Sequence, residues 1–354
     1  MLKKILALSL SAFLLLGLLT ACGVSSLTEP ELFTFSTETE TNAETKTDKE
    51  KEFDEEKEAK VMKILTLGSS SSVDSNHMLN LVAHREGFDQ DLVIGTLYYS
   101  GCKLSQHVQF LTKNSNVYSL YLSSTKTPNS PPKIEKNITM GEALRYDNWD
   151  IIFLQAGGSE SMSDSAFTNG NITIIRKYVE ANRRNPSAVY GWHAIGVSST
   201  DPELIATYPY SPNPYATSAE KFNYDRNLML TERTSRLERY IMSDPTYEYV
   251  IPSCTAIENA ITSCLGQKGI KRDYTHLTDV GRLVASYFWY AKLSGIKQLD
   301  QIQLDAIPKA FLKSTTDKTQ DRPLTDTEKA VILESVNNAL KNPLEITQSQ
   351  IITN

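Results

Sequence analysis

Two groups of polar residues in this sequence have the composition of a hydrolytic centre. A run of four serines begins at Ser69, directly after an apolar segment, and Asp273 stands three residues before His276. A serine hydroxyl is a weak nucleophile and needs a neighbouring base, for which imidazole is suited because it titrates near neutral pH. A carboxylate then fixes the tautomer of the imidazole and stabilises its protonated form. Ser70, His276 and Asp273 fit these three roles.

Alternating apolar and amphipathic segments predict the elements that position these residues. Five apolar runs, at 61–67, 91–98, 149–155, 188–193 and 247–252, predict buried strands, and the stretches 75–86, 172–183, 218–242 and 277–293 predict helices. Strands that alternate with helices imply crossover connections and a parallel sheet. The predicted fold is a three-layer α/β/α sandwich with a mainly parallel five-stranded sheet, as in flavodoxin-like proteins. Sites in such folds lie beyond the carboxyl ends of the strands.

Short motifs follow the other strands at that edge, and in their order they resemble a known superfamily. Ser100-Gly101-Cys102 follows the second run, Gln155-Ala156-Gly157-Gly158 follows the third, and Gly191-Trp192-His193 ends the fourth. Together with the serine run and Asp273-x-x-His276, they resemble the SGNH (GDSL-type) hydrolases, whose first block is Gly-Asp-Ser-x-Ser and whose last is Asp-x-x-His. The chain is most similar to an uncharacterised bacterial branch of that superfamily, over about residues 61–298. Further matching segments are Lys63-Ile64-Leu65-Thr66-Leu67-Gly68, Ser72-Val73-Asp74-Ser75-Asn76, Trp149-Asp150, Leu154-Gln155 and Val250-Ile251-Pro252.

The resemblance implies a role for each motif. Ser70 matches the nucleophile, and its backbone N–H is expected to form part of an oxyanion hole. Gly101 matches the second block, where the missing side chain lets the backbone N–H approach the developing oxyanion. The third block of the superfamily supplies an Asn side chain that is absent here, and Gln155 is the best amide substitute. Losing one such donor typically lowers the rate by about 100- to 1,000-fold.

Two further points stay open in the sequence. Ser69 stands where the superfamily has Asp, and the run of serines leaves the position of the nucleophile open by one residue. Trp192 and His193 are candidates for substrate binding, although His193 could equally be a hydrogen-bonded structural histidine. The proline- and tyrosine-rich segment 198–218 has no helical period, so we expect a long loop that either covers a binding site or packs rigidly.

The N-terminus has the pattern of an export signal. Lys3 and Lys4 precede an apolar run, 5–19, which is followed by the small-residue cleavage pattern Leu19-Thr20-Ala21-Cys22. This pattern resembles a bacterial lipoprotein signal, which implies removal of residues 1–21 and acylation of Cys22 on the outer face of the membrane. A plain transmembrane anchor is the alternative, but this run is shorter than the roughly 20 residues that span a bilayer.

Composition divides the rest of the chain into three parts. Residues 22–60 are rich in Ser, Thr, Glu and Lys and predict a disordered acidic tether, because they cannot bury enough apolar surface to offset the entropy of ordering. Residues 61–298 form the predicted hydrolase-like domain. Residues 299–354 predict a helical extension, in which Thr325-x-x-Glu328 is a capping box.

Charge and cysteine content exclude several classes of function. The chain has a net charge of −6, most of which lies in the tether, so the domain has no basic stripe and we predict no nucleic-acid partner. No Cys or His cluster has the spacing of a zinc site, and we predict no metal and no cofactor. Cys254 and Cys264 are close enough in sequence for a disulfide, which the sequence neither requires nor excludes.

These features predict a surface-anchored serine esterase that removes acetyl or another small acyl group from carbohydrate or from another small ester. A non-catalytic glycan- or ligand-binding lipoprotein on the same fold is one alternative. An acyltransferase is another, because it uses the same covalent serine intermediate with a sugar acceptor in place of water.

Overall fold

The computed structural model describes residues 60–315 and 317–353. The predicted signal peptide, the acylated Cys22 and all but the last residue of the predicted tether lie outside these residues. None of the helices within the described residues has the length and apolar character needed to cross a membrane.

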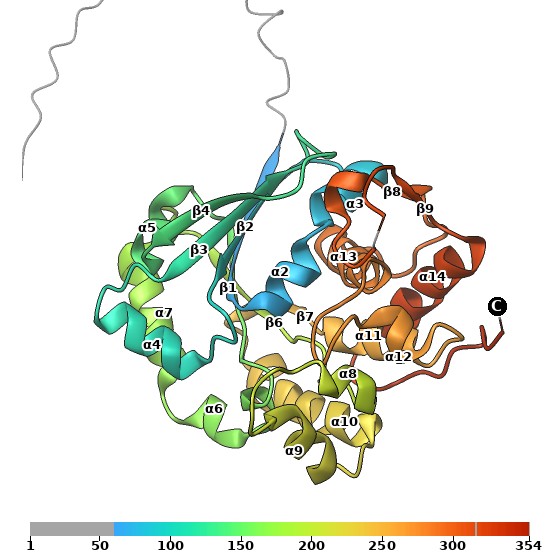
Figure 1. The fold of residues 1–354 in the computed structure, drawn as a ribbon. Coiled ribbons are helices and arrows are strands. Elements are labelled where there is room, and N and C mark those ends of the chain that lie inside the picture. Colours follow the sequence, from blue (N-terminus) through green and yellow to red (C-terminus); the bar gives the residue numbers. More distant parts are fainter. Residues whose placement is uncertain (1–59, 316, 354) are drawn as a thin grey trace, which may run out of the picture. The chain divides into compact units, whose positions relative to one another are not determined.

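A seven-stranded sheet forms the centre of the domain, with strand order β4-β3-β2-β1-β5-β6-β7 (Figure 1). The strands are β1 (Val61–Gly68), β2 (Asp91–Tyr98), β3 (Tyr118–Ser124), β4 (Lys133–Ile138), β5 (Ile151–Leu154), β6 (Val189–His193) and β7 (Tyr247–Ile251). Strands β2, β1, β5, β6 and β7 pair in parallel and correspond to the five predicted runs. The predicted α/β fold is confirmed, but the predicted count of five strands is wrong, because β3 and β4 extend the sheet in antiparallel fashion beyond β2.

The two additional strands lack the continuous apolar character of the central ones. Strand β3 has the sequence YSLYLSS, and the edge strand β4, KIEKNI, buries only Ile138. Lysines on an edge strand oppose pairing with other chains, which explains the polar composition of β4. A search for buried apolar runs therefore passes over both strands.

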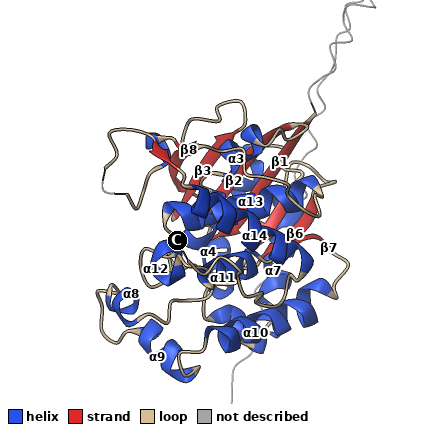
Figure 2. Cartoon of the chain, turned by 90° about the vertical axis from the view of Figure 1, so that its right-hand side faces the viewer, coloured by secondary structure: helices blue, strands red, loops and turns tan. Residues whose placement is uncertain are grey.

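Helices cover both faces of the sheet (Figures 1 and 2). On one face lie α2 (Ser70–Asn76), α3 (Leu79–Arg85), α11 (Ser253–Ile261), α12 (Gly266–Ile270), α13 (Asp279–Ser294) and α14 (Asp326–Lys341). The other face carries α4 (Leu104–Thr112), α5 (Met140–Tyr146), α7 (Asn171–Asn182), α10 (Arg226–Leu237) and the π-helical turn η2 (Glu238–Met242). Because side chains alternate along a strand, Ile64 of β1 packs in the first core and Leu65 packs in the second.

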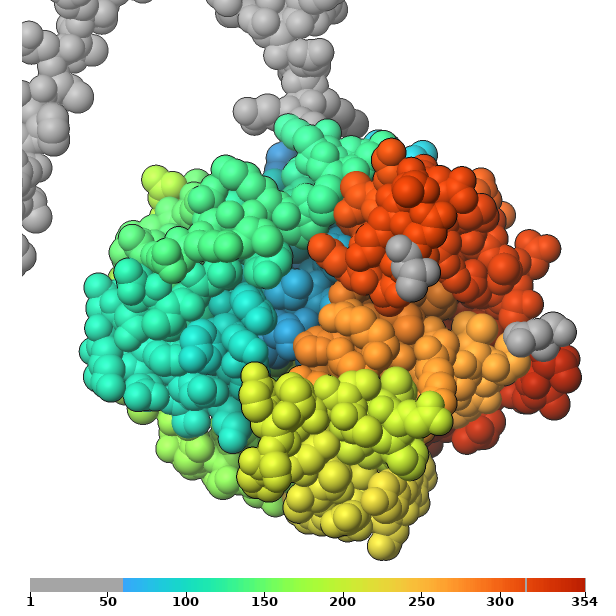
Figure 3. All heavy atoms as spheres, viewed as in Figure 1, coloured from blue at the N-terminus to red at the C-terminus, as the bar shows by residue number. Residues whose placement is uncertain are grey.

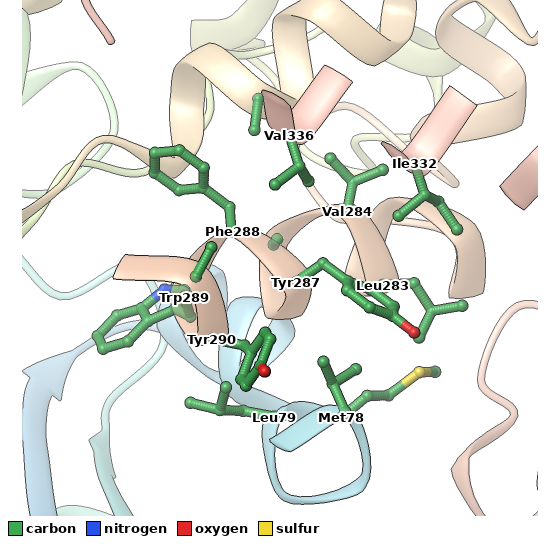
Figure 4. Packing of buried hydrophobic residues seen from close by; sticks show 14 of the residues in the cluster. Met78, Leu79, Leu283, Val284, Tyr287, Phe288, Trp289, Tyr290, Ile332 and Val336 are labelled. Atoms are coloured by element: carbon green, nitrogen blue, oxygen red, sulfur yellow. The ribbon is translucent and has the colours of Figure 1, made fainter. Parts of the chain in front are cut away.

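Helix α13 is buried along nearly its whole length on the first face. Figure 4 shows Tyr287, Phe288, Trp289 and Tyr290 of α13 packed among Met78 and Leu79 at the start of α3, and Ile332 and Val336 of α14. Since α13 follows directly after His276, this packing fixes the position of the Asp-x-x-His loop against the sheet.

The C-terminal residues pack against the domain. Helix α14 contacts α11 and α13, and Thr325 caps it by accepting a hydrogen bond from the Glu328 N–H at 3.1 Å. The Glu328 carboxylate in turn accepts from the Thr325 N–H at 3.0 Å, so the predicted capping box is confirmed. The same region holds the short strands β8 (Ala306–Ile307) and β9 (Arg322–Pro323) and the 3-10 turn η3 (Lys309–Phe311).

The segment predicted as a long loop contains two short helices. Helix α8 (Pro202–Ala206) begins after Asp201, and α9 (Pro214–Lys221) begins after Asn213; each cap side chain accepts two backbone hydrogen bonds. Proline fits the first position of a helix because the missing N–H has no partner there, so the Asp-Pro and Asn-Pro pairs start these helices. The prediction of an irregular loop was wrong because these helices are only one or two turns long, too short to produce a clear helical period.

Candidate active site

Two of the predicted site residues, Ser70 and Gly101, line a cleft beyond the carboxyl ends of β1 and β2. The cleft has a volume of about 200 Å³. Ser70 and Gly101 line it, together with Thr275, which precedes His276. Figure 3 shows a hollow here, in which the blue segment near β1 and α2 is visible between teal, orange and yellow-green surfaces. The remaining lining residues are Ser69, Ser71, Lys103, Gly158, Ser159, Ser198, Pro214, Tyr215 and Ser218.

Two of the four serines after β1 are used to hold the turn itself. Ser69 receives a hydrogen bond from Gln155 Nε2 on its hydroxyl at 2.9 Å. The buried Ser72 hydroxyl donates to Gln155 Oε1 and lies 3.2 Å from His193 Nδ1. Ser70 and Ser71 remain at the start of α2, which begins at Ser70 and not at the predicted Ser75. Because the hydroxyls of Ser69 and Ser72 are already hydrogen-bonded within the turn, Ser70 and Ser71 remain as the two candidates for a nucleophile.

The backbone N–H groups of Ser70 and Gly101 are the groups that the sequence predicts as oxyanion donors. Gly101 has a φ of 60°, a left-handed conformation that favours glycine because a side chain would clash with its own backbone. Ser70 is the first residue of α2, where an N–H has no partner within the helix. Among the described residues, neither N–H donates a hydrogen bond to a protein acceptor.

The Asp-x-x-His loop holds the imidazole in one tautomer. His276 Nδ1 lies 3.0 and 2.9 Å from the two carboxylate oxygens of Asp273. The same carboxylate accepts the N–H groups of Thr275 at 2.9 Å and His276 at 2.8 Å. Partial burial acts to raise the pKa of Asp273, but these hydrogen bonds outweigh it and hold the pKa well below its usual range. The low pKa means that Asp273 is ionised, and a carboxylate in this position favours the imidazole tautomer that carries its proton on Nδ1.

Asp74 connects the serine helix to this loop, a role that sequence reasoning missed. Its buried carboxylate accepts the Leu277 N–H at 2.9 Å, directly after His276, and Arg282 Nε at 2.9 Å. Asp74 stands four residues after Ser70 in α2, and residues at this spacing share a helix face. The contact ties the helix that begins with Ser70 to the loop that carries His276. No linear signal could have shown it, since Asp74 and Leu277 lie 203 positions apart.

Three predicted residues lie behind the cleft instead of in it. Gln155 is buried, and its Nε2 group donates to Ser69 and, at 3.5 Å, to the carbonyl of Ala156, so its predicted role as an oxyanion donor is not what this geometry provides. His193 is fully buried, and its Nε2 lies 2.7 Å from the Ser253 hydroxyl. Burial, with a smaller contribution from Arg233, lowers the pKa of His193 to about 3. Trp192 packs against Phe167 and Tyr247 in the second core.

Trp192 and His193, which the sequence suggested as substrate-binding residues, are buried and do not line the cleft. Both are the last residues of β6, where neighbouring side chains point to opposite faces of the sheet. Each is buried in the packing on its own face. His193 is the hydrogen-bonded structural histidine of the two readings that the sequence left open.

Arg233 is a second residue that sequence reasoning missed. Its fully buried guanidinium donates to the carbonyls of Ile195 and Gly196, the latter at 2.6 Å, and to the Gly158 carbonyl at 2.7 Å. Arg233 thus joins the loops that follow β5 and β6, which provide Gly158 and Ser198 to the cleft wall. An arginine on an amphipathic helix is ordinarily exposed, so its sequence position gave no indication of this role.

Metal ligation and disulfide bonding find no support in the described part of the chain. Between Lys60 and Thr353, no group of three or more described His, Cys, Asp or Glu side chains is arranged to hold an ion. Cys102, Cys254 and Cys264 are all free thiols, so the possible bridge between the last two is not formed.

Comparison with known proteins identifies the family and supports the fold. The sequence profile of DUF4886, described as a domain of unknown function, matches residues 63–303. A crystal structure of a DUF4886 family protein from Bacteroides uniformis is 20% identical and superposes with a TM-score of 0.65, covering 83% of this chain and 100% of that one. A gut microbial diltiazem-metabolizing enzyme is 13% identical, with a TM-score of 0.35 over 70% of this chain and 49% of its own. No curated protein matches this chain significantly. The chain belongs to the DUF4886 family.

Proposed function

We propose that this protein is a serine esterase of the SGNH type, which removes acetyl or another small acyl group from carbohydrate. The contact between Asp74 and the Leu277 N–H carries the proposal, because it ties the helix that begins with Ser70 to the loop that carries His276. In the described residues no hydrogen bond joins the Ser70 hydroxyl to the imidazole. Such catalytic bonds often tighten only in the complex with substrate.

The geometry supports acyl transfer through a covalent serine intermediate. Ser70 Oγ attacks the acyl carbon while its proton passes to His276 Nε2, and the C=O bond becomes a C–O⁻ group. The bond to the alcohol then breaks, and the imidazolium returns the proton to the leaving oxygen. Water attacks the acyl-Ser70 in the same manner, releases the carboxylic acid and restores the free hydroxyl.

Backbone groups are the proposed oxyanion donors. The N–H groups of Ser70 and Gly101 supply two of them. The peptide between Gly158 and Ser159 supplies a third, because Arg233 and the Ser161 hydroxyl hold its carbonyl at 2.7 and 2.8 Å. In a trans peptide the N–H points opposite to the carbonyl, and both residues line the cleft. This donor takes the place that the superfamily fills with an Asn side chain.

The cleft supports a small acyl group and a hydroxylated alcohol. Its volume of about 200 Å³ falls below the roughly 300 Å³ at which pockets begin to enclose drug-sized ligands. Many of its lining residues carry hydroxyl groups, and Tyr215 offers an aromatic face beside them. We place the protein on the outer face of the bacterial membrane, held by a lipid on Cys22, because the lipobox pattern supports this location.

One observation favours a second candidate function. Because the Gln155 amide is occupied by Ser69, the site lacks the side-chain oxyanion donor of the superfamily. A glycan-binding lipoprotein that has kept the fold without turnover would need no such donor.

Labelling with a serine-directed fluorophosphonate tests the proposed function. The esterase is expected to react and to hydrolyse p-nitrophenyl acetate, and mass spectrometry of the labelled peptide is expected to place the adduct on Ser70. A folded protein that neither reacts nor turns over any short ester would favour the binding protein. Product that appears only when a sugar acceptor is added would instead identify an acyltransferase.

A further inference from the structure

A groove leads away from the candidate active site along α9. It has a volume of about 520 Å³ and shares Ser159, Pro214 and Ser218 with the catalytic cleft. Because the same three residues line both spaces, the groove adjoins the cleft. One wall is α9, and the other is formed by η1 (Glu160–Met162) and α6 (Asp164–Thr168).

The sizes of the two spaces indicate how a substrate is divided between them. The cleft at Ser70 holds about 200 Å³, enough for the reacting acyl group and its immediate surroundings. The groove of about 520 Å³ lies within the range of roughly 300–1,000 Å³ typical of ligand sites. An ester no larger than its acyl group and one sugar would leave most of the groove without substrate.

The lining of the groove indicates a hydroxylated occupant. Ser163, Ser165 and Thr217 line it beyond the three shared residues. Ser163 and Ser165 share one hydrogen bond at 2.8 Å, and Thr217 donates to the Asn213 carbonyl at 3.3 Å, so each hydroxyl oxygen still has capacity to accept from a sugar hydroxyl. A long acyl chain would leave that capacity unused. Met162 and Phe222 supply apolar surface of the limited extent that a sugar face requires.

Ion pairs give the groove a fixed floor. Arg236 Nη2 lies 3.2 Å from Asp164 Oδ2, and the Tyr240 hydroxyl donates to Asp164 Oδ1 at 2.9 Å. These contacts tie α6 to α10 and η2, and both Asp164 and Arg236 line the groove. A preformed surface costs less conformational entropy when a ligand binds.

From this arrangement we infer that the enzyme acts on acylated oligosaccharide chains, whose sugar residues beyond the acylated unit bind along α9. This inference rests on the proposed esterase function and specifies its substrate. Binding energy from sugar units remote from the reacting ester can be used to lower the barrier at that ester. The value of kcat/KM is therefore expected to rise with chain length.

The test compares chain lengths in the full protein. Chemically acetylated gluco-, xylo- and chito-oligosaccharides are assayed from monomer to tetramer beside p-nitrophenyl acetate. For at least one backbone, kcat/KM is expected to rise about tenfold or more from monomer to tetramer.

Absence of a rise for every backbone, while p-nitrophenyl acetate is hydrolysed, would overturn the inference and leave the esterase proposal intact. Loss of all turnover would instead overturn the esterase proposal. A preference for p-nitrophenyl octanoate over the acetate would show that the groove accepts an acyl chain, and would also overturn the inference.

A matched pair of variants locates the effect. Thr217 and Thr112 are both exposed helical threonines whose hydroxyls donate to the carbonyl four residues earlier, at 3.3 and 2.8 Å. Only Thr217 lines the groove. Thr217→Trp is expected to lower the ratio of kcat/KM for tetramer to that for p-nitrophenyl acetate by about tenfold, whereas Thr112→Trp leaves both values within about twofold. Equal ratios in the two variants would contradict the assignment of the groove.

Discussion

The carboxylate of Asp74 accepts the backbone N–H of Leu277 at 2.9 Å and thereby ties α2 to the loop that carries His276. Asp74 also pairs with buried Arg282 at 2.6 Å and with Arg272 at 3.4 Å. Arg282 extends the connection to Asp279 at 3.2 Å, at the start of α13. One buried ionic network therefore connects the helix of the proposed nucleophile with the loop of the proposed base, although the two lie at opposite ends of the domain sequence.

Replacing Asp74 is expected to impair catalysis more than substrate binding. Asp74→Asn weakens the hold on the Leu277 N–H and leaves Arg282 with less compensating charge. A displacement of His276 by about 1 Å is enough to lower kcat about 100-fold. Steady-state kinetics on p-nitrophenyl acetate should show this fall in kcat with KM changed little, because Asp74 does not line the cleft.

Asp279→Asn provides the matched control for Asp74. Asp279 is also buried and paired with Arg282. Its carboxylate, however, accepts from the backbone N–H groups of Lys313, Ser314 and Thr315 and not from the loop of His276. Breaking either ion pair is expected to lower the free energy of unfolding by about 3–5 kcal/mol. Urea unfolding of both variants checks this expectation. Equal losses of kcat in both would show that Asp74 acts through general stability and not by positioning His276.

Removing the proposed nucleophile or base should abolish turnover. Ser70→Ala and His276→Ala are each expected to eliminate hydrolysis of p-nitrophenyl acetate, and the double variant should be little worse than either, because the two residues act as a unit. Ser71→Ala is the control for register and should keep its activity. An inactive Ser71→Ala beside an active Ser70→Ala would move the nucleophile by one residue.

Asp273→Asn tests the orienting carboxylate separately. The amide can donate to Nδ1 and so favours the tautomer in which Nε2 carries the proton and cannot act as a base. The equivalent change in a serine protease triad lowers kcat about 10⁴-fold. Circular dichroism should show that the fold is kept, while the rate of fluorophosphonate labelling falls. Labelling at the rate of the unmodified protein would exclude Asp273 from the triad.

Comparison of the predicted and observed elements shows where local sequence patterns suffice. The buried parallel strands were recognisable because Ile64 and Leu65 face different cores, which makes the whole run apolar. Strand β4 was not recognisable from its sequence, because this edge strand pairs only with β3 and leaves most of its side chains in solvent.

The candidate site was predictable in its residue types but not in its supports. Ser70, Gly101, Asp273 and His276 could be proposed from the sequence because their motifs follow the predicted elements in a recognisable order. Asp74 could not be found, because its partners are distant in sequence and meet it only after α13 packs against α2. Gln155 was assigned to the right edge of the sheet, but only the structure shows that its amide faces the turn at Ser69.

The proposed membrane anchor depends on Cys22, which lies outside the described residues. Cys22→Ser removes the thiol that would carry the lipid, so the protein is expected to leave the membrane fraction or to keep its signal peptide. Fractionation followed by immunoblotting measures both outcomes. Cys102→Ser is a suitable control, because this buried thiol is far from the signal in sequence and should leave fractionation unchanged. Normal signal cleavage with full membrane retention of Cys22→Ser would refute lipid anchoring.

Three buried histidines are expected to make stability fall as the solution is acidified. Burial lowers the pKa of His77 to about 4, that of His107 to about 4 and that of His193 to about 3. The unfolded chain binds protons at these side chains near pH 6.5, whereas the folded chain does not until the pH is much lower. The free energy of unfolding therefore rises with pH in this range. As the pH falls from about 6.5 toward 4, it decreases by about 1.4 kcal/mol per pH unit for each histidine.

Urea unfolding at pH 7, 6 and 5 measures this slope. His107 Nδ1 lies 2.8 Å from the Tyr118 hydroxyl, and His107→Gln can keep a hydrogen bond there without a titrating group. This variant is expected to reduce the slope between pH 6 and 5 by about one proton, or about 1.4 kcal/mol per pH unit. His84 is exposed and provides the control, since its replacement by Gln should leave the slope unchanged. A free energy of unfolding that stays constant between pH 7 and 5 would mean that the folded protein binds protons at these histidines over the same pH range as the unfolded chain, and would contradict the lowered pKa values.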